Sequence, residues 1–230
     1  AKDVKQEAWP EFERHLKLSR THLEYSWMLE PLWPFTPDML ISVTTADYDP
    51  DYSCQDWFYR TCEAEFDFPG AYPRLLNSLR PRWGGSVEQM EEFARQCLAT
   101  NRFDTIVPYI LIDTIADIES MELPWDPELK KTWNPKTLLT EFLQKREAYR
   151  ADHPDEKLFG DTTHYHSLII RQLFLNQMGE QAMAEYRLAK DKINWNQLQD
   201  DHYPGHHYIR RLFAAQEEHL DRVMKLDETL

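Results

Sequence analysis

Apolar residues recur at intervals of three and four along most of the chain, which is the spacing of amphipathic α-helices. The first such stripe consists of Phe12, Leu16, Leu23 and Trp27. It predicts one long helix that ends near Pro31. A second stripe within residues 87–98 and further stripes in the last third of the chain have the same spacing. The hydrophobic pattern therefore predicts a chain built mainly from helices.

Prolines and short β-branched runs interrupt this pattern. Two prolines within residues 33–37 predict a non-helical segment, because proline lacks a backbone donor and restricts the residue before it. Residues 40–45 (Leu-Ile-Ser-Val-Thr-Thr) are the one β-like run. We expect an extended linker there, with a short strand as the open alternative, since an isolated strand has no partner.

Capping signals mark several helix starts. Ser53, Ser86 and Asn134 each precede an apolar stripe, and Asp161 or Thr162 precedes another. Gly179 is expected to end the helix that follows residue 162. The fold class predicted from these signals is all-α: an irregular stack or bundle of helical hairpins, with about nine or ten helices and at most one short strand.

The proline-rich stretch near residues 122–135 is the best candidate for a boundary. We expect an N-terminal helical half, residues 1–123, that contains a Trp-Gly-Gly-Ser loop. Residues 124–230 then form a C-terminal helical half, and the two halves pack as one unit.

The loop at residues 80–86 (Arg-Pro-Arg-Trp-Gly-Gly-Ser) is a candidate contact surface. Gly84 and Gly85 permit backbone angles that other residues resist. An exposed Trp83 flanked by Arg80 and Arg82 would suit a protein interface, where tryptophan and arginine are enriched. The competing interpretation is that Trp83 packs inward and that the arginines pair with acids of the following helix, such as Glu88.

The helix expected at residues 106–121 is strongly apolar, yet it carries two acids four positions apart, Asp113 and Asp117. Such a pair could serve in acid–base catalysis or bind magnesium. It could equally form a narrow solvated stripe or pair with arginines. We assign Asp113 and Asp117, together with Arg80, Arg82 and Trp83, to partner binding, and we assign no catalytic, cofactor or metal residue.

Histidines near the C-terminus provide the alternative hypothesis. His202, His206 and His207 lie close to Asp200 and Asp201, and imidazole with carboxylate is a ligand set for zinc or iron. Pro204-Gly205 separates the histidines, so they do not share one helical face. The alternative function is a helical metal-dependent hydrolase that uses this histidine cluster.

The amino-acid composition limits the classes of partner that the chain can bind. Acidic residues outnumber basic ones by 40 to 26, and the formal net charge is −14. A nucleic-acid-binding surface needs a local excess of Lys and Arg, so we expect no nucleic acid partner. An acidic surface favours association with a basic protein, although it also serves solubility alone. No apolar run approaches about 18 residues, so we expect no membrane partner.

The segment from Pro81 to Ala94 resembles a bacterial family of helical domains without an assigned function. The shared pattern is P-R-W-G-G-S-x-E-x-M-x-x-F-A, preceded by a tyrosine-containing helix into which Tyr72 fits. The resemblance implies helical architecture and bacterial origin, and it supplies no catalytic residue. A cytoplasmic location is expected; a processed, exported form stays open because the chain begins at Ala1.

Taken together, these patterns favour a non-enzymatic protein-binding or adaptor domain without a cofactor. One concrete version is an immunity-type inhibitor that neutralises a basic toxin through charge complementarity.

Overall fold

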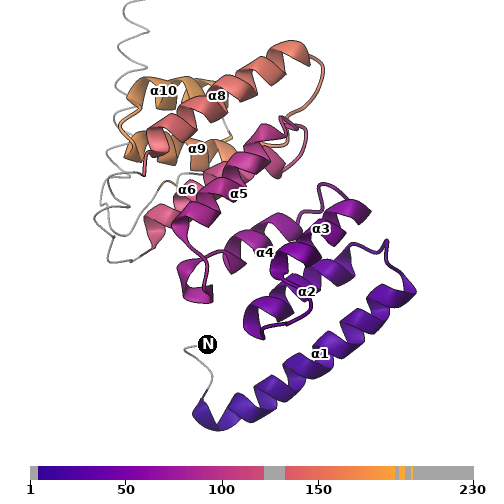
Figure 1. Cartoon of the computed structure of the whole chain (residues 1–230). Coiled ribbons are helices and arrows are strands. Elements are labelled where there is room, and N and C mark those ends of the chain that lie inside the picture. The colour runs from indigo at the N-terminus through magenta and orange to yellow at the C-terminus, as the bar shows by residue number, and fades with distance from the viewer. Residues whose placement is uncertain (1–4, 122–132, 190–191, 195–197, 199–230) are drawn as a thin grey trace, which may run out of the picture. The chain divides into compact units, whose positions relative to one another are not determined.

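Helices make up all the regular secondary structure that is described (Figure 1). The computed structural model describes residues 5–121, 133–189, 192–194 and 198. Within these ranges there are nine α-helices and no strand, which confirms the all-α prediction. The helices are α1 (Trp9–Leu29), α2 (Phe35–Ala46), α3 (Cys54–Ala64), α4 (Ala71–Ser78), α5 (Val87–Ala99), α6 (Ile110–Ser120), α8 (Pro135–Asp152), α9 (Thr163–Leu175) and α10 (Gly179–Ala189).

The chain divides into two compact units, Ala1–Thr114 and Ile115–Leu230, called here the N-terminal unit and the C-terminal unit. The division falls inside α6. The boundary predicted between residues 123 and 124 falls outside the described residues and stays a prediction, as does the packing of the two halves as one unit.

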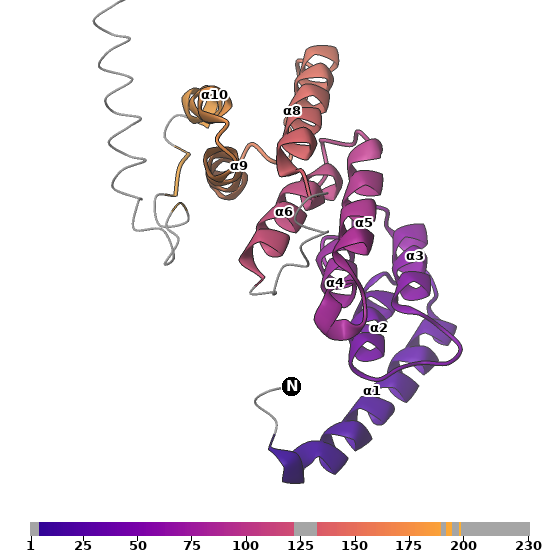
Figure 2. The same cartoon turned by 60° about the vertical axis from the view of Figure 1, so that its left-hand side comes forward.

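Helix α1 is the outermost element of the N-terminal unit and lies beside α2 (Figures 1 and 2). None of its 21 residues is fully buried. The predicted stripe is half-buried at each position: Phe12, Leu16, Leu23 and Trp27. The helix ends at Leu29, two residues before Pro31, as the pattern predicted.

Helix α2 corrects two predictions. Residues 40–45 are helical rather than extended, and the helix already includes Pro37. A proline in the first turn is tolerated because its missing N–H would have no partner within the helix. Leu40 and Ile41 are fully buried. Since α1, α3 and α4 all pack on α2, burial on several faces replaces the polar face that would have indicated a helix.

Aromatic side chains join α3, α4 and α5. Phe58 contacts both Tyr72 and Phe93 with ring centroids 5.0 and 5.4 Å apart, and Tyr72 stacks on Phe93. The Tyr72 hydroxyl donates a hydrogen bond of 2.6 Å to the carbonyl of Phe66. Two of the residues that carry the family resemblance, Tyr72 and Phe93, are therefore core residues of this unit.

The predicted caps are present in both units. Ser53 forms a reciprocal capping box with Asp56, and the hydroxyl of Ser86 accepts from the Gln89 amide at 3.2 Å. In the C-terminal unit, Asn134 and Thr162 cap α8 and α9. Gly179 does not end α9 as expected: it begins α10, and Gln177 adopts the left-handed conformation with φ 56°.

Candidate binding site

The Trp-Gly-Gly-Ser loop is a tight turn whose two glycines are needed for different reasons. Pro81–Trp83 form a 3-10 turn, and Gly84 follows with φ 91°, in the left-handed region that favours glycine. Gly85 has no such angle, but a Cβ there would lie 2.0 Å from the Leu79 carbonyl oxygen. The predicted conformational role is confirmed for Gly84, and Gly85 is required by close packing.

Trp83 remains at the surface, with 39% of its area exposed. The Arg82 guanidinium lies 5.7 Å from its ring centroid and donates to the Asn77 side chain at 3.0 Å. For Arg82, the partner is thus Asn77 and not an acid of the following helix. Tryptophan and arginine are in contact at this surface, which is the arrangement that the partner-binding prediction needs.

Trp83 also lines a pocket of about 450 Å³ in the N-terminal unit. Its volume lies in the range of roughly 300–1,000 Å³ that small-ligand sites occupy. No lysine or arginine is among the described residues that line it. The chemistry comes from three acids and three aromatic residues: Asp49, Asp51, Asp56, Tyr48, Tyr52 and Trp83.

The three aspartates of this pocket differ in the ion pairs and hydrogen bonds that their carboxylates already make. Asp49 is buried, pairs with the guanidinium of Arg20, and accepts hydrogen bonds from the backbone amides of Asp51 and Tyr52. Asp56 accepts from the hydroxyl and amide of Ser53 at 2.6 and 2.7 Å, and these bonds lower its pKa. Asp51 is exposed and forms no ion pair with a described residue. The charge of Arg60 also acts on Asp56. Among the described residues, Asp51 is therefore the pocket carboxylate without a basic partner, and it leaves the pocket with negative charge.

The aromatic residues offer ring faces beside these carboxylates. Tyr48 is 84% exposed. Tyr52 already holds a cation on one face, since the guanidinium of Arg60 lies 4.1 Å from its centroid. The same guanidinium lies 4.6 Å from Trp27 and 4.5 Å from Trp57, so three rings surround it. This unit therefore already stabilises one cation by aromatic contacts.

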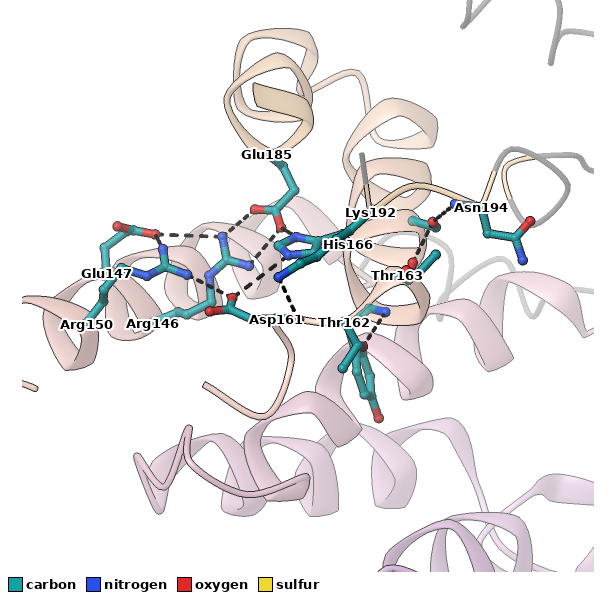
Figure 3. Close-up of polar contacts among 12 residues, drawn as sticks. Arg146, Glu147, Arg150, Asp161, Thr162, Thr163, His166, Glu185, Lys192 and Asn194 are labelled. Carbon is teal, nitrogen blue, oxygen red and sulfur yellow. Dashed lines mark hydrogen bonds and ion pairs between the residues drawn. The ribbon is translucent and has the colours of Figure 1, made fainter. Parts of the chain in front are cut away.

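A second charged cluster lies in the C-terminal unit, where three helices each contribute one buried side chain (Figure 3). Arg146 of α8, His166 of α9 and Glu185 of α10 are each at most 3% exposed. Both carboxylate oxygens of Glu185 pair with Arg146, and Oε1 also lies 2.6 Å from His166 Nδ1. Asp161 lies 3.9 Å from the other ring nitrogen of His166 and pairs with Arg150.

The carboxylate of Glu185 has its charge and hydrogen-bond partners within this buried cluster. Burial raises the pKa of Glu185, but the hydrogen bond from His166 and the charge of Arg146 outweigh burial and hold the pKa at about 2. Arg146 and Glu185 line a hollow of about 290 Å³, with Leu143 and Leu188 among its other walls. Since the carboxylate already has two partners, the geometry is that of a structural link between α8, α9 and α10.

The remaining predicted site residues lie apart from the pocket lining. Asp113 and Asp117 are half-buried, one turn apart on α6. His202, His206 and His207 lie outside the described residues, so the hydrolase hypothesis stays a prediction. Within the described ranges, no group of three His, Cys, Asp or Glu side chains could hold a metal ion.

Sequence reasoning missed the pocket acids and the buried cluster. Asp51 and Tyr48 fall in a polar loop without a motif, and only the fold brings them close to Trp83. Arg146 and Glu185 are 39 positions apart, and neither breaks the helical pattern around it. The one available signal was His166, which lies among the apolar residues of α9.

Comparisons with known proteins add no relative. No protein family matches the chain, and neither curated proteins nor solved structures give a significant match. Among the described helices, none combines the length and the apolar character needed to cross a membrane.

Proposed function

We propose that this chain is a non-enzymatic protein-binding domain. The observation that carries the proposal is a group of six large apolar side chains in the last turns of α1, in the connection to α2 and at the start of α2, each at least 50% exposed. We call it the apolar edge; it consists of Tyr25, Met28, Leu29, Leu32, Trp33 and Phe35. Contiguous exposed apolar residues of this kind commonly mark a protein–protein contact.

The net charge indicates which kind of partner suits this surface. At −14 the chain repels other acidic proteins and attracts basic ones over a Debye length. An apolar contact supplies affinity, while the surrounding acids accelerate encounter with a basic partner. A specific form of the proposal is an immunity-type inhibitor of a basic toxin, acting in the cytoplasm of a bacterium; the bacterial origin is what the family resemblance implies.

Affinity capture with matched baits tests the proposal. The wild-type chain, an edge variant carrying Leu32→Glu and Trp33→Ala, and a control variant Leu18→Glu are immobilised and exposed to lysate of the source organism. Leu18 lies on α1 outside the apolar edge and is 46% exposed. A basic protein retained by wild type and control but lost with the edge variant supports the proposal.

The captured protein is then purified and titrated against the three baits. We expect the edge variant to raise Kd at least about tenfold, which is the effect of removing interface anchors worth 1 kcal/mol or more each. Equal binding by edge and control variants would contradict the proposed surface. Binding that does not weaken with salt would contradict charge-steered association. Inhibition of the partner's own activity would support the immunity-type form.

A further inference from the structure

We infer that the pocket beside Trp83 accepts one arginine side chain of the partner protein. This inference rests on the proposed function and adds the chemistry of one contact to it. Four side chains carry it: Tyr48, Asp51, Asp56 and Trp83, all of which line the pocket. They supply two carboxylates and two partly exposed aromatic rings around a hollow of about 450 Å³.

The charges of the lining residues determine the charge of the occupant. Among the described residues, Asp49 pairs directly with a basic side chain, Arg20, whereas Asp51 and Asp56 form no ion pair, although the charge of Arg60 also acts on Asp56. Asp56 stays ionised because the hydroxyl and amide of Ser53 donate to it and lower its pKa. Asp51 is exposed and contributes a second negative charge. A cation is the occupant that these carboxylates stabilise, and an anion would be repelled.

The rings favour a planar cation. Arginine can pair with a carboxylate through two parallel hydrogen bonds while its flat guanidinium stacks on an aromatic face. The chain already contains the aromatic part of this arrangement, because the guanidinium of Arg60 lies within 4.6 Å of the ring centroids of Trp27, Tyr52 and Trp57. Tyr48, which is 84% exposed, and Trp83 offer the same kind of surface to an incoming side chain.

Volume and exposure are consistent with insertion of a single side chain. The hollow has the volume of a small-ligand site rather than that of an extended groove. One inserted arginine surrounded by weaker contacts is a common hot-spot arrangement at protein interfaces. Lysine would fit the charge but not the planar stacking, so we expect it to bind more weakly.

The test uses the full chain and two small probes of matched shape. N-acetyl-L-arginine amide and its neutral isostere N-acetyl-L-citrulline amide are titrated into ¹⁵N-labelled protein at low ionic strength and followed by NMR. We expect the arginine probe to shift the backbone amides of residues 48–56 and the indole signal of Trp83 in a saturable way. The citrulline probe should bind at least about tenfold more weakly.

Variants locate the site. Asp51→Asn should weaken the arginine probe by about threefold, and Tyr48→Ala by a similar factor. The matched control is Asp155→Asn, an exposed aspartate of the C-terminal unit that should leave the affinity unchanged. Unchanged amide shifts away from the pocket show that each variant is folded. Equal affinity for both probes, or no effect of Asp51→Asn, would overturn the inference.

The outcome separates this inference from the proposed function. Saturable arginine binding at these residues with no captured partner would uphold the pocket and defeat the protein-binding proposal. A captured partner whose affinity depends on Leu32 and Trp33, combined with no arginine binding, would do the reverse.

Discussion

Two acidic residues, one in each unit, are placed in opposite environments. In the C-terminal unit, Glu185 is 2% exposed, and its carboxylate is shared between Arg146 and His166. In the N-terminal unit, Asp51 lies exposed at the rim of a pocket that has no basic residue in its described lining. The first carboxylate has its partners inside the chain, and the second is free to meet solvent or, as we propose, a partner from outside.

This difference separates a structural charge from a recognition charge. A buried ion pair seldom adds much stability relative to apolar packing, but breaking it leaves an uncompensated charge and costs much. An exposed carboxylate contributes little to folding, so its replacement changes stability only slightly. Substitutions in the two places should therefore differ strongly in their effect on stability.

The largest effect on stability is expected at the buried cluster of Arg146, His166 and Glu185. Glu185→Gln removes the charge that faces Arg146 and should lower the free energy of unfolding by about 3–5 kcal/mol. The control is Glu180→Gln, an exposed position on the same helix, which should change stability by less than about 0.5 kcal/mol. Urea denaturation followed by circular dichroism measures both, and equal losses would contradict a structural role for Glu185.

Lowering the pH should reduce the stability that the same cluster contributes to the fold. The pKa of Glu185 lies at about 2, below its ordinary value of 4.5. A lowered pKa gives stability that is fully present above pH 4.5 and is lost as the pH falls toward 2, by about 3 kcal/mol at this shift.

Other carboxylates titrate in the same range, and burial raises the pKa of Asp38, which acts with the opposite sign. The acid unfolding curve is therefore compared with that of the double variant Arg146→Met/Glu185→Leu. If the pH dependence of the two proteins is the same, Glu185 is not its source.

The loop beside the pocket should be sensitive to one methyl group. Gly85→Ala places a Cβ 2.0 Å from the Leu79 carbonyl and should cost about 1–3 kcal/mol. Gly84→Ala meets no atom within 4 Å, so its cost is limited to the left-handed backbone, about 1 kcal/mol. Thermal denaturation ranks the two variants; a greater loss for Gly84→Ala would show that backbone angle dominates at this turn.

The smallest effects on stability are expected in the pocket beside Trp83. Ser53→Ala removes the cap of α3 and should cost about 1 kcal/mol. It also removes the hydroxyl bond that lowers the pKa of Asp56, so that pKa should rise, as measured by NMR titration of the carboxyl carbon. Asp51→Asn should change stability by less than about 0.5 kcal/mol. A large destabilisation by Asp51→Asn would place this residue in the fold rather than in recognition.

Local signals predicted most helices, because capping and amphipathic spacing are decided within a few residues. Ser53, Ser86 and Asn134 cap the helices that they were predicted to start. The prediction failed at α2, where apolar residues on several faces hid the helical period. Only the tertiary packing of α1, α3 and α4 on that helix explains its pattern.

The candidate site was predictable only in part, for the same reason. Trp83 could be singled out because tryptophan, two arginines and two glycines stand together in sequence. The acids and tyrosines that share its pocket come from residues 48–56, a loop and the first turn of α3, more than 25 positions earlier, and nothing in their spacing relates them to Trp83. A site assembled from separate loops depends on the fold, and the sequence alone does not specify it.

The contact between Trp27 and Trp57 provides an intrinsic spectroscopic signal. The two indoles lie 5.6 Å apart at 84°, one on α1 and the other on α3. At such a separation their electronic transitions couple and produce a distinct band in the circular dichroism spectrum. The band would disappear when α1 leaves α3, so detachment of the outermost helix could be followed without any added dye.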